Sequence, residues 1–385
     1  MTLEKDLIFS EEEFRGRVAA VQKELEAENA DALLVHQTHN VFYLSGYQTT
    51  GTPNYQFLLI SRAGDPTLLC RGLESRLADY YSWVSDVVVW EDTDDPISAT
   101  KRVLDDRDLG AAKIGYEGTS NWLTSRNLKR IEEALPEVTW KDLGGTVEKG
   151  RLVKSPAEIE YIRQAARITE AGMAKSLEAA REGNSENDVA AAAAAGMISA
   201  GSEPFTTSPI ITSGPRSAVA HTSFRRRKME MGDTLLVEIS GVFNRYTGPL
   251  MRSAVIGPPH DRMQKMWDAL NEGLEAAIAA IRPGVTSGEV DEACTGILRK
   301  KNLYEYYKKR LGYSVGIGFA PGWGEGAIMD LKQNDDRVLE AGMVFHMPPA
   351  LRVDEKWGFG LSETITVTEN GCDVITNFSR DLVVG

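Results

Sequence analysis

The hydrophobic positions at the start of the chain follow a helical spacing. Phe14, Val18, Val21 and Leu25 recur every three or four residues among charged neighbours, which predicts an amphipathic helix over residues 11–29. Short apolar runs then alternate with helical patterns. Strands are predicted at 32–35, 56–60, 66–70, 87–90 and 113–116, with helices at 73–81 and 98–105. This alternation predicts an α/β layer domain.

A new helix signature marks the end of that domain. Ser155 can cap the helix, Pro156 suits its first turn, and Glu158 stands at the reciprocal position of a capping box. Two glycines, Gly144 and Gly145, precede this signature. We therefore predict one domain over residues 1–150 and a second over residues 151–385.

The second domain contains an internal repeat. Residues 172–192 can be laid on residues 273–293 with a constant offset, which pairs Gly183 with Gly284. Each copy has the pattern of helix, glycine turn and helix. A glycine-led strand follows each copy, at 235–239 and at 343–347. The repeat predicts two halves about a pseudo-two-fold axis, and clefts at such junctions are preferred ligand sites.

Composition narrows the choice of partners. Of the 385 residues, 42% are hydrophobic and 26% charged, which is typical of a globular protein. The formal net charge of -13 would repel nucleic acid and anionic lipid, so neither is expected as a partner. No apolar segment reaches membrane-spanning length, and no secretory signal is recognisable. The three cysteines form no CxxC pair, which favours a reducing, cytoplasmic location.

Six segments of the chain share features with a known fold, and they are residues 154–159, 233–239, 246–252, 312–316, 342–344 and 363–371. They resemble landmarks of the pita-bread fold that creatinase, aminopeptidase P and methionine aminopeptidase share. The resemblance implies an α+β protein, with a creatinase-like N-terminal α/β domain followed by a pita-bread domain. It also implies a homodimer, in which Tyr47 and the loop 48–53 reach the cleft of the neighbouring subunit.

The sequence differs from that family at the positions of the metal ligands. Its metallopeptidases hold two metal ions with two aspartates, a histidine and two glutamates. The matching positions here carry Glu238, Pro249, Tyr313, Pro348 and Ser362. Proline has no side-chain donor, so this set cannot replace a dinuclear cage. The sequence therefore predicts no metal and no other cofactor.

Metal-independent members of the family act on small amidines and guanidines. Residues 319–325 and 360–364 resemble the ectoine hydrolase branch, which implies hydrolysis of the cyclic amidine of ectoine, and of hydroxyectoine, to N-acetyl-2,4-diaminobutyrate. The active-site glutamate of creatinase would fall near Met251, which counts against creatine. The alternatives are a hydrolase or lyase for another small zwitterionic solute, an Xaa-Pro peptidase, and a binding module without activity.

Three residues are candidates for the chemistry. Glu238 ends an apolar strand and could activate water or attack the amidine carbon itself. His221 lies in a loop that resembles the one carrying the substrate histidine of the family, and it could protonate the leaving nitrogen. Glu363 could face either the cleft or its back, because adjacent strand residues point to opposite sides.

Five further residues are candidates for substrate binding. Trp323 and Tyr313 could form an aromatic wall for an amidinium group, with core packing as the alternative. His346 precedes Pro348 by two residues and shares its face of the strand. Glu325, close to Trp323, and Tyr47 complete the set.

Overall fold

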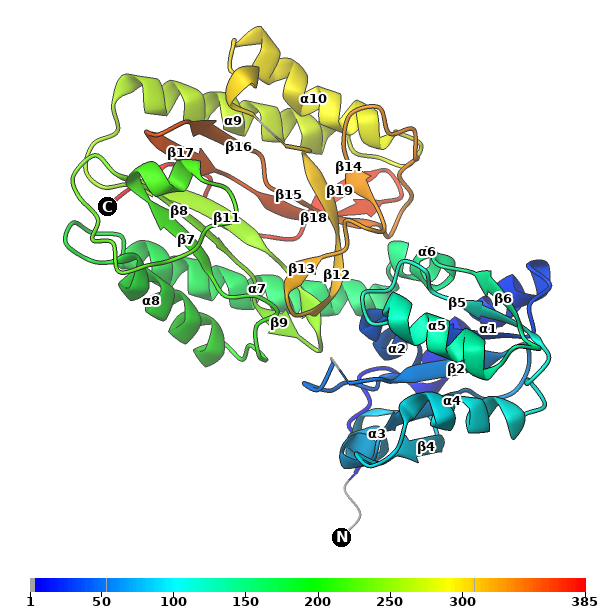
Figure 1. The fold of residues 1–385 in the computed structure, drawn as a ribbon. Helices are drawn as coiled ribbons and strands as arrows, with labels where there is room; N and C mark the ends of the chain where they lie inside the picture. The colour runs from blue at the N-terminus through cyan, green and yellow to red at the C-terminus, as the bar shows by residue number, and fades with distance from the viewer. Residues whose placement is uncertain (1–3, 53, 308) are drawn as a thin grey trace. The chain divides into compact units, whose positions relative to one another are not determined.

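The computed structural model describes residues 4–52, 54–307 and 309–385. It divides into two compact units, Met1–Arg151 and Leu152–Gly385 (Figure 1). The sequence predicts the domain boundary between residues 150 and 151. Each unit is described by itself below.

A mixed sheet forms the centre of the N-terminal unit. Its strands lie in the order β4-β3-β2-β1-β5-β6. They span Ala32–Val35 (β1), Phe57–Ser61 (β2), Thr67–Arg71 (β3), Asp86–Trp90 (β4), Lys113–Tyr116 (β5) and Thr139–Asp142 (β6). The pairs β1-β2 and β2-β3 are antiparallel, and the other neighbours are parallel. The predicted α/β layer domain is confirmed.

The helices of this unit follow the sequence pattern closely. They are α1 (Glu11–Ala27), α2 (Thr38–Ser45), α3 (Ser75–Tyr81), α4 (Pro96–Asp105), α5 (Ser125–Ala134) and α6 (Thr146–Leu152). The first begins where the Ser10 side chain accepts a hydrogen bond from the Glu13 amide, and it buries Phe14, Val18, Val21 and Leu25. These are the four positions whose spacing predicted it.

Two helical pairs build the C-terminal unit, as the repeat predicts. They are α7 (Pro156–Glu178) with α8 (Glu186–Ser199), and α9 (Asp261–Ala280) with α10 (Ser287–Lys300). The turn within each pair has a glycine with positive φ, +83° at Gly183 and +88° at Gly284, where a side chain would be strained. Two residues later, Ser185 and Thr286 each close a capping box at the start of the second helix. The duplicated turn chemistry explains why the two sequence copies align.

Each helical pair packs on its own group of strands. One group has the order β20-β11-β8-β7 and packs against α7 and α8. Its strands span Ile210–Ser213 (β7), Thr234–Ile239 (β8), Leu250–Val255 (β11) and Val383–Val384 (β20). The side chains between them form a core that includes Val189, Met197, Val237 and Ile239.

The other group has the order β19-β18-β15-β12-β10-β9, with β13 and β14 also paired to β12. Its strands span Val242–Phe243 (β9), Tyr246–Thr247 (β10), Gly312–Phe319 (β12), Gly322–Gly324 (β13), Asp330–Leu331 (β14), Val344–Met347 (β15), Glu363–Thr368 (β18) and Gly371–Val374 (β19). A separate hairpin joins β16 (Ala350–Val353) to β17 (Trp357–Gly360). Leu270, Leu274, Val290 and Leu298 of α9 and α10 pack against Phe345 of β15. Figure 1 shows the strands of this unit between its two helical pairs.

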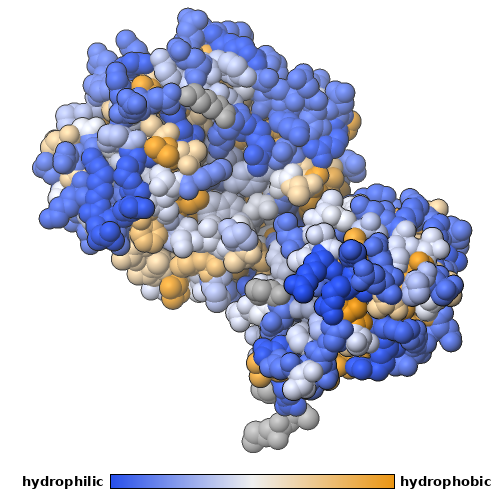
Figure 2. Space-filling model, in the orientation of Figure 1, coloured by the Kyte–Doolittle hydropathy of each residue, from blue (hydrophilic) through white to orange (hydrophobic). Residues whose placement is uncertain are grey.

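Hydrophilic residues cover most of the face drawn in Figure 2. Within the described ranges, no helix is long and apolar enough to cross a membrane.

Candidate active site

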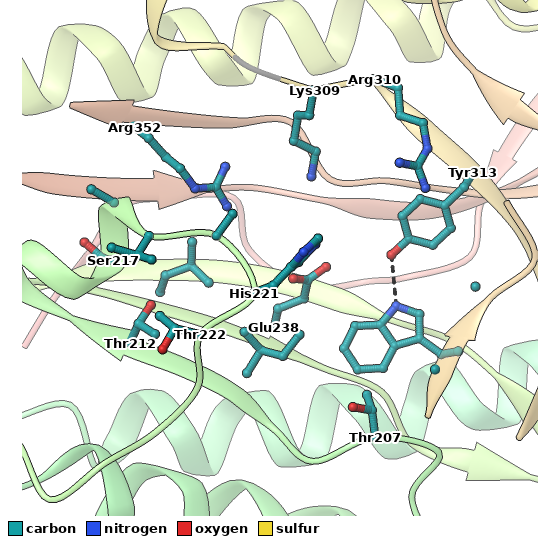
Figure 3. Close-up of a pocket in the computed structure, with 18 of the residues that line it drawn as sticks. Thr207, Thr212, Ser217, His221, Thr222, Glu238, Lys309, Arg310, Tyr313 and Arg352 are labelled. Atoms are coloured by element: carbon teal, nitrogen blue, oxygen red, sulfur yellow. Dashed lines mark hydrogen bonds between the residues drawn. The ribbon is translucent and has the colours of Figure 1, made fainter. Parts of the chain in front are cut away.

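A cavity of about 720 Å³ opens in the C-terminal unit. Its lining comes from β7, β8, β12, β13, β16 and the loops beside them (Figure 3). The residues that can ionise there are His221, Glu238, Lys309, Arg310, Tyr313, Arg352 and Asp354. Among them, Glu238, His221 and Tyr313 were sequence candidates, as was Trp323 in the same lining.

The alternation of strand β8 turns Glu238 into the cavity. Leu236 and Glu238 line the cavity, whereas Val237 and Ile239 between them pack into the core against the helices. Burial raises the pKa of the Glu238 carboxyl above its ordinary value, and the positive charges of Lys309 and Arg352 partly oppose this rise. A carboxylate in this setting is a stronger base than an exposed one.

Two cations face Glu238 and were missed in the sequence. The side chains of Lys309 and Arg352 form no hydrogen bond or ion pair with any residue that the structure describes, although both line the cavity. Burial lowers the pKa of the Lys309 ammonium to about 8, and it also lowers the pKa of Arg352. Arg310 differs, because its Nε lies 2.7 Å from the Asp330 carboxylate. Lys309 and Arg352 therefore remain available to an anionic group of a ligand.

These cations gave little signal in the sequence. Lys309 belongs to the basic run 308–310, which resembles an ordinary solvated charge run. Arg352 comes four residues after Pro348, and only the pairing of β16 with β17 fixes its place in the hairpin. A search for cations near the family's ligand positions would have found Arg352.

His221 lines the cavity from the loop that follows the short helix η2 (Gly214–Ala218). Its side chain is exposed and its φ is +57°. The buried carboxylate of Glu186 holds this loop. It pairs with Arg216 and accepts hydrogen bonds from the backbone N–H groups of Ser213 (2.8 Å) and Arg225 (2.7 Å). These contacts therefore hold in place the loop that carries His221.

Tyr313 and Trp323 form one aromatic corner of the cavity. The indole Nε1 of Trp323 donates a hydrogen bond to the Tyr313 hydroxyl at 2.9 Å, the dashed line in Figure 3. His346 is fully buried behind this corner and outside the cavity lining, with its Nδ1 3.0 Å from the Tyr313 hydroxyl. The sequence predicts that His346 contacts the substrate, whereas the structure places it in contact with Tyr313.

Glu363 faces the back of the strand, which corrects its assignment as a cleft residue. Its carboxylate is buried and accepts hydrogen bonds from Arg252 (2.9 Å) and Arg380 (2.7 Å), and from the Thr376 hydroxyl. The neighbouring Ser362 takes the opposite direction and contacts His346. Strand alternation allowed either orientation, and the ion pairs with the arginines explain the one observed.

Glu325 and Tyr47 also lie outside this cavity lining. Glu325 is buried beneath the Trp323 hairpin, where its carboxylate lies 3.0 Å from the Lys154 ammonium. Tyr47 belongs to the N-terminal unit, where it is 1% exposed and its hydroxyl lies 3.4 Å from the Glu74 carboxylate. Each side chain is engaged inside its own unit, and the expected contact of Tyr47 with the cleft of a neighbouring subunit stays a prediction. Of the loop 48–53 that was expected beside Tyr47, residue 53 lies outside the described residues.

The residues at the family's metal positions do not fit a two-metal centre. Glu238 is the one carboxylate among the five, two are prolines, and the hydroxyls of Tyr313 and Ser362 are both hydrogen-bonded to His346. Over the described ranges, no three histidine, cysteine, aspartate or glutamate side chains gather where they could hold a metal ion. The donor set therefore lacks the oxygen and nitrogen ligands that two divalent cations require.

Comparison with known proteins defines the class. Residues 160–369 match the model of metallopeptidase family M24, and residues 17–153 match the creatinase/prolidase N-terminal domain. The chain belongs to metallopeptidase family M24, with a creatinase-like N-terminal domain and a pita-bread C-terminal domain. The predicted fold class is confirmed.

Particular relatives are hydrolases of two kinds. The chain is 27% identical to the ectoine hydrolase of Halomonas elongata over 99% of its own length and all of that protein. It is 26% identical to the Xaa-Pro dipeptidase of Pyrococcus furiosus over 96% of its length and again all of the relative. The structure of an Xaa-Pro dipeptidase from Bacillus anthracis superposes with a TM-score of 0.85 at 24% identity, covering 96% of this chain and 99% of the other. The relatives support a hydrolase.

Proposed function

We propose that this protein is a metal-independent hydrolase that opens the cyclic amidine of ectoine, and of hydroxyectoine, to N-acetyl-2,4-diaminobutyrate. The observation that carries the proposal is that one cavity holds the carboxylate of Glu238 and the cations Lys309 and Arg352, whose side chains have no ion-pair partner among the described residues. Ectoine carries a delocalised cation and a carboxylate, so each of its charges meets an opposite charge there. The likeness to the Halomonas elongata enzyme supports the same choice.

The geometry supports a simple sequence of steps. Glu238 takes a proton from water as the water oxygen bonds to the amidine carbon, or the carboxylate attacks that carbon first. A ring C–N bond then breaks, and His221 protonates the leaving nitrogen. The aromatic faces of Tyr313 and Trp323 hold the amidinium group, while Arg352 and Lys309 hold the carboxylate.

Ring opening of ectoine, followed by proton NMR with and without a chelator, tests this function. We expect equal turnover in both samples, and a strongly reduced turnover by Glu238→Gln. Unchanged ectoine would remove the substrate from consideration. Loss of turnover with the chelator would instead show that the reaction requires a metal.

The second candidate is an Xaa-Pro peptidase, which the Pyrococcus furiosus relative favours. A Xaa-Pro dipeptide offered with added divalent cations separates the two, because the residues at the family's metal positions give no reason to expect cleavage. Creatine and other zwitterionic solutes in the same assay test the remaining substrates. Binding of ectoine without turnover would identify a binding module.

We also propose that the protein is a cytoplasmic homodimer, as the resemblance to creatinase implies. The described cysteines, Cys70, Cys294 and Cys372, are all free, which is compatible with a reducing compartment. Light scattering after size-exclusion chromatography would measure the mass, and a single-chain mass would contradict the dimer.

A further inference from the structure

A chain of hydrogen bonds runs from the backbone to the aromatic corner of the cavity. The Met251 amide donates to Ser362 Oγ at 2.6 Å, and Ser362 Oγ lies 2.8 Å from His346 Nε2. His346 Nδ1 in turn lies 3.0 Å from the Tyr313 hydroxyl. Trp323 Nε1 donates to the same hydroxyl at 2.9 Å. The two ends of the chain are N–H groups, which can only donate.

These fixed ends determine where the proton of His346 lies. Ser362 Oγ accepts from the Met251 amide, and its own proton needs an acceptor because the side chain is fully buried. Among the described residues, His346 Nε2 is the atom that can take it. Burial, together with the charges of Lys309 and Arg252, holds the pKa of His346 well below its ordinary range, so the ring is neutral. A neutral ring that accepts at Nε2 carries its proton on Nδ1.

The opposite tautomer leaves a buried group unsatisfied. If Nε2 carried the proton, Ser362 Oγ would accept two hydrogen bonds, and its hydroxyl proton would have no acceptor among the residues described. Buried polar groups are almost always paired, so the Nδ1 tautomer is favoured.

The consequence concerns the proton of Tyr313. Its oxygen accepts from His346 Nδ1 and from Trp323 Nε1, so neither neighbour can receive the phenolic proton. No other described residue hydrogen-bonds to this hydroxyl. The oxygen points toward the middle of the cavity, on the side of Glu238 (Figure 3). The one direction left for the O–H bond is into the cavity.

We propose that Tyr313 is a catalytic hydrogen-bond donor whose O–H group binds the substrate oxygen formed when water adds to the carbon beside Glu238. This deepens the proposed function and rests on it. Water gives one proton to Glu238 as its oxygen bonds to the amidine carbon, and the C=N electrons move to a ring nitrogen. The C–N bond then breaks as His221 protonates the leaving nitrogen, and a C=O bond forms. One of the two water protons replaces the proton that His221 gave, and the other completes the ammonium group of the released amine. Tyr313 keeps its own proton throughout.

His346 and Ser362 are positioning residues in this scheme. They touch the hydroxyl of Tyr313 or each other and lie outside the cavity lining. Their role is to keep two donors on the Tyr313 oxygen, so that its proton is already oriented before the substrate binds. Donors oriented in advance stabilise developing charge without reorganisation.

Replacing Tyr313 with phenylalanine tests the donor. Tyr313→Phe keeps the ring and removes the hydroxyl, so we expect kcat with ectoine to fall about 10²- to 10³-fold while KM changes much less. The matched control is Tyr246→Phe, because Tyr246 is also buried and its hydroxyl donates to Glu158 at 2.7 Å, away from the cavity lining. This control should keep the wild-type kcat. A wild-type kcat in Tyr313→Phe would overturn the role of the hydroxyl.

A second measurement needs neither turnover nor a variant of Tyr313. The ¹⁵N shifts of the histidine rings in the wild-type protein, with His346 assigned by comparison with His346→Gln, report which nitrogen carries the proton. We expect a neutral ring protonated at Nδ1 between pH 6 and 9. Protonation at Nε2 would overturn the orientation of Tyr313, whereas absence of ectoine turnover in the wild type would overturn the proposed function alone.

Discussion

Glu238 on β8 and Glu363 on β18 are both strand glutamates of the same unit, yet their surroundings differ. Glu363 is buried with Arg252 and Arg380 on its carboxylate, so its charge is neutralised inside the protein. Glu238 has Lys309 and Arg352 across a cavity, without a direct ion pair to either. A carboxylate that is already paired stabilises the fold, and one that is left unpaired beside a cavity is free to react with a ligand.

The largest expected effect comes from removing the charge of Glu238. Glu238→Gln should lower kcat by roughly 10²- to 10⁴-fold, the usual loss when a general base is removed. Its stability should stay equal or rise, because burial already disfavours the charged carboxyl. Steady-state kinetics and thermal unfolding measure both quantities. A Glu238→Gln variant that unfolds at a lower temperature and retains its turnover would show that Glu238 stabilises the fold and does not act in catalysis.

The same substitution at Glu363 should act on stability instead. Glu363→Gln leaves Arg252 buried without its counterion, and breaking a buried ion pair costs about 3–5 kcal/mol in the free energy of unfolding. Denaturant unfolding of the C-terminal unit measures this loss. Ectoine turnover by the folded fraction should be close to that of the wild type, and a specific loss of kcat would contradict a purely structural role.

The smallest expected effect is a pH dependence of ligand affinity. Burial sets the pKa of Lys309 at about 8, below its ordinary 10.5, against the opposing attraction of Glu238 and with repulsion from Arg352 and Arg310. Below pH 8 the buried, charged Lys309 therefore lowers the free energy of unfolding. The free energy of unfolding rises as the pH rises from about 8 toward 10.5.

In contrast to stability, the affinity for a carboxylate ligand should weaken as the pH rises through about 8. Isothermal titration with ectoine from pH 6.5 to 9.5 measures this dependence. Lys309→Arg keeps its charge over that range and should remove the step. A step that persists in the variant would assign it to another group.

Local signals in the sequence predicted most of the fold. The spacing of Phe14, Val18 and Leu25 located α1, and the glycine turns at Gly183 and Gly284 located both helical pairs. These features depend on neighbours within a few residues, which is why they can be read along the chain. The division of the second domain into two halves followed from the internal repeat.

The candidate site was less predictable, because its contacts join distant segments. Glu238 was found from the family's ligand position and its place at the end of a strand, but the direction of Glu363 depends on Arg252 and Arg380, far away along the chain. Lys309 and Arg352 meet only when the loop before β12 and the hairpin of β16 line the same cavity. They matter because their side chains have no ion-pair partner in the part of the chain that the structure describes, and a sequence does not show a missing partner.

The carboxylate of Glu186 connects a helix end to the loop of His221. It lies in the first turn of α8 and holds Ser213, Arg216 and Arg225, on both sides of the histidine. The position of the histidine thus depends on a helix that does not line the cavity. Engineers who wish to move that imidazole for a larger substrate should redesign the start of α8 together with the loop.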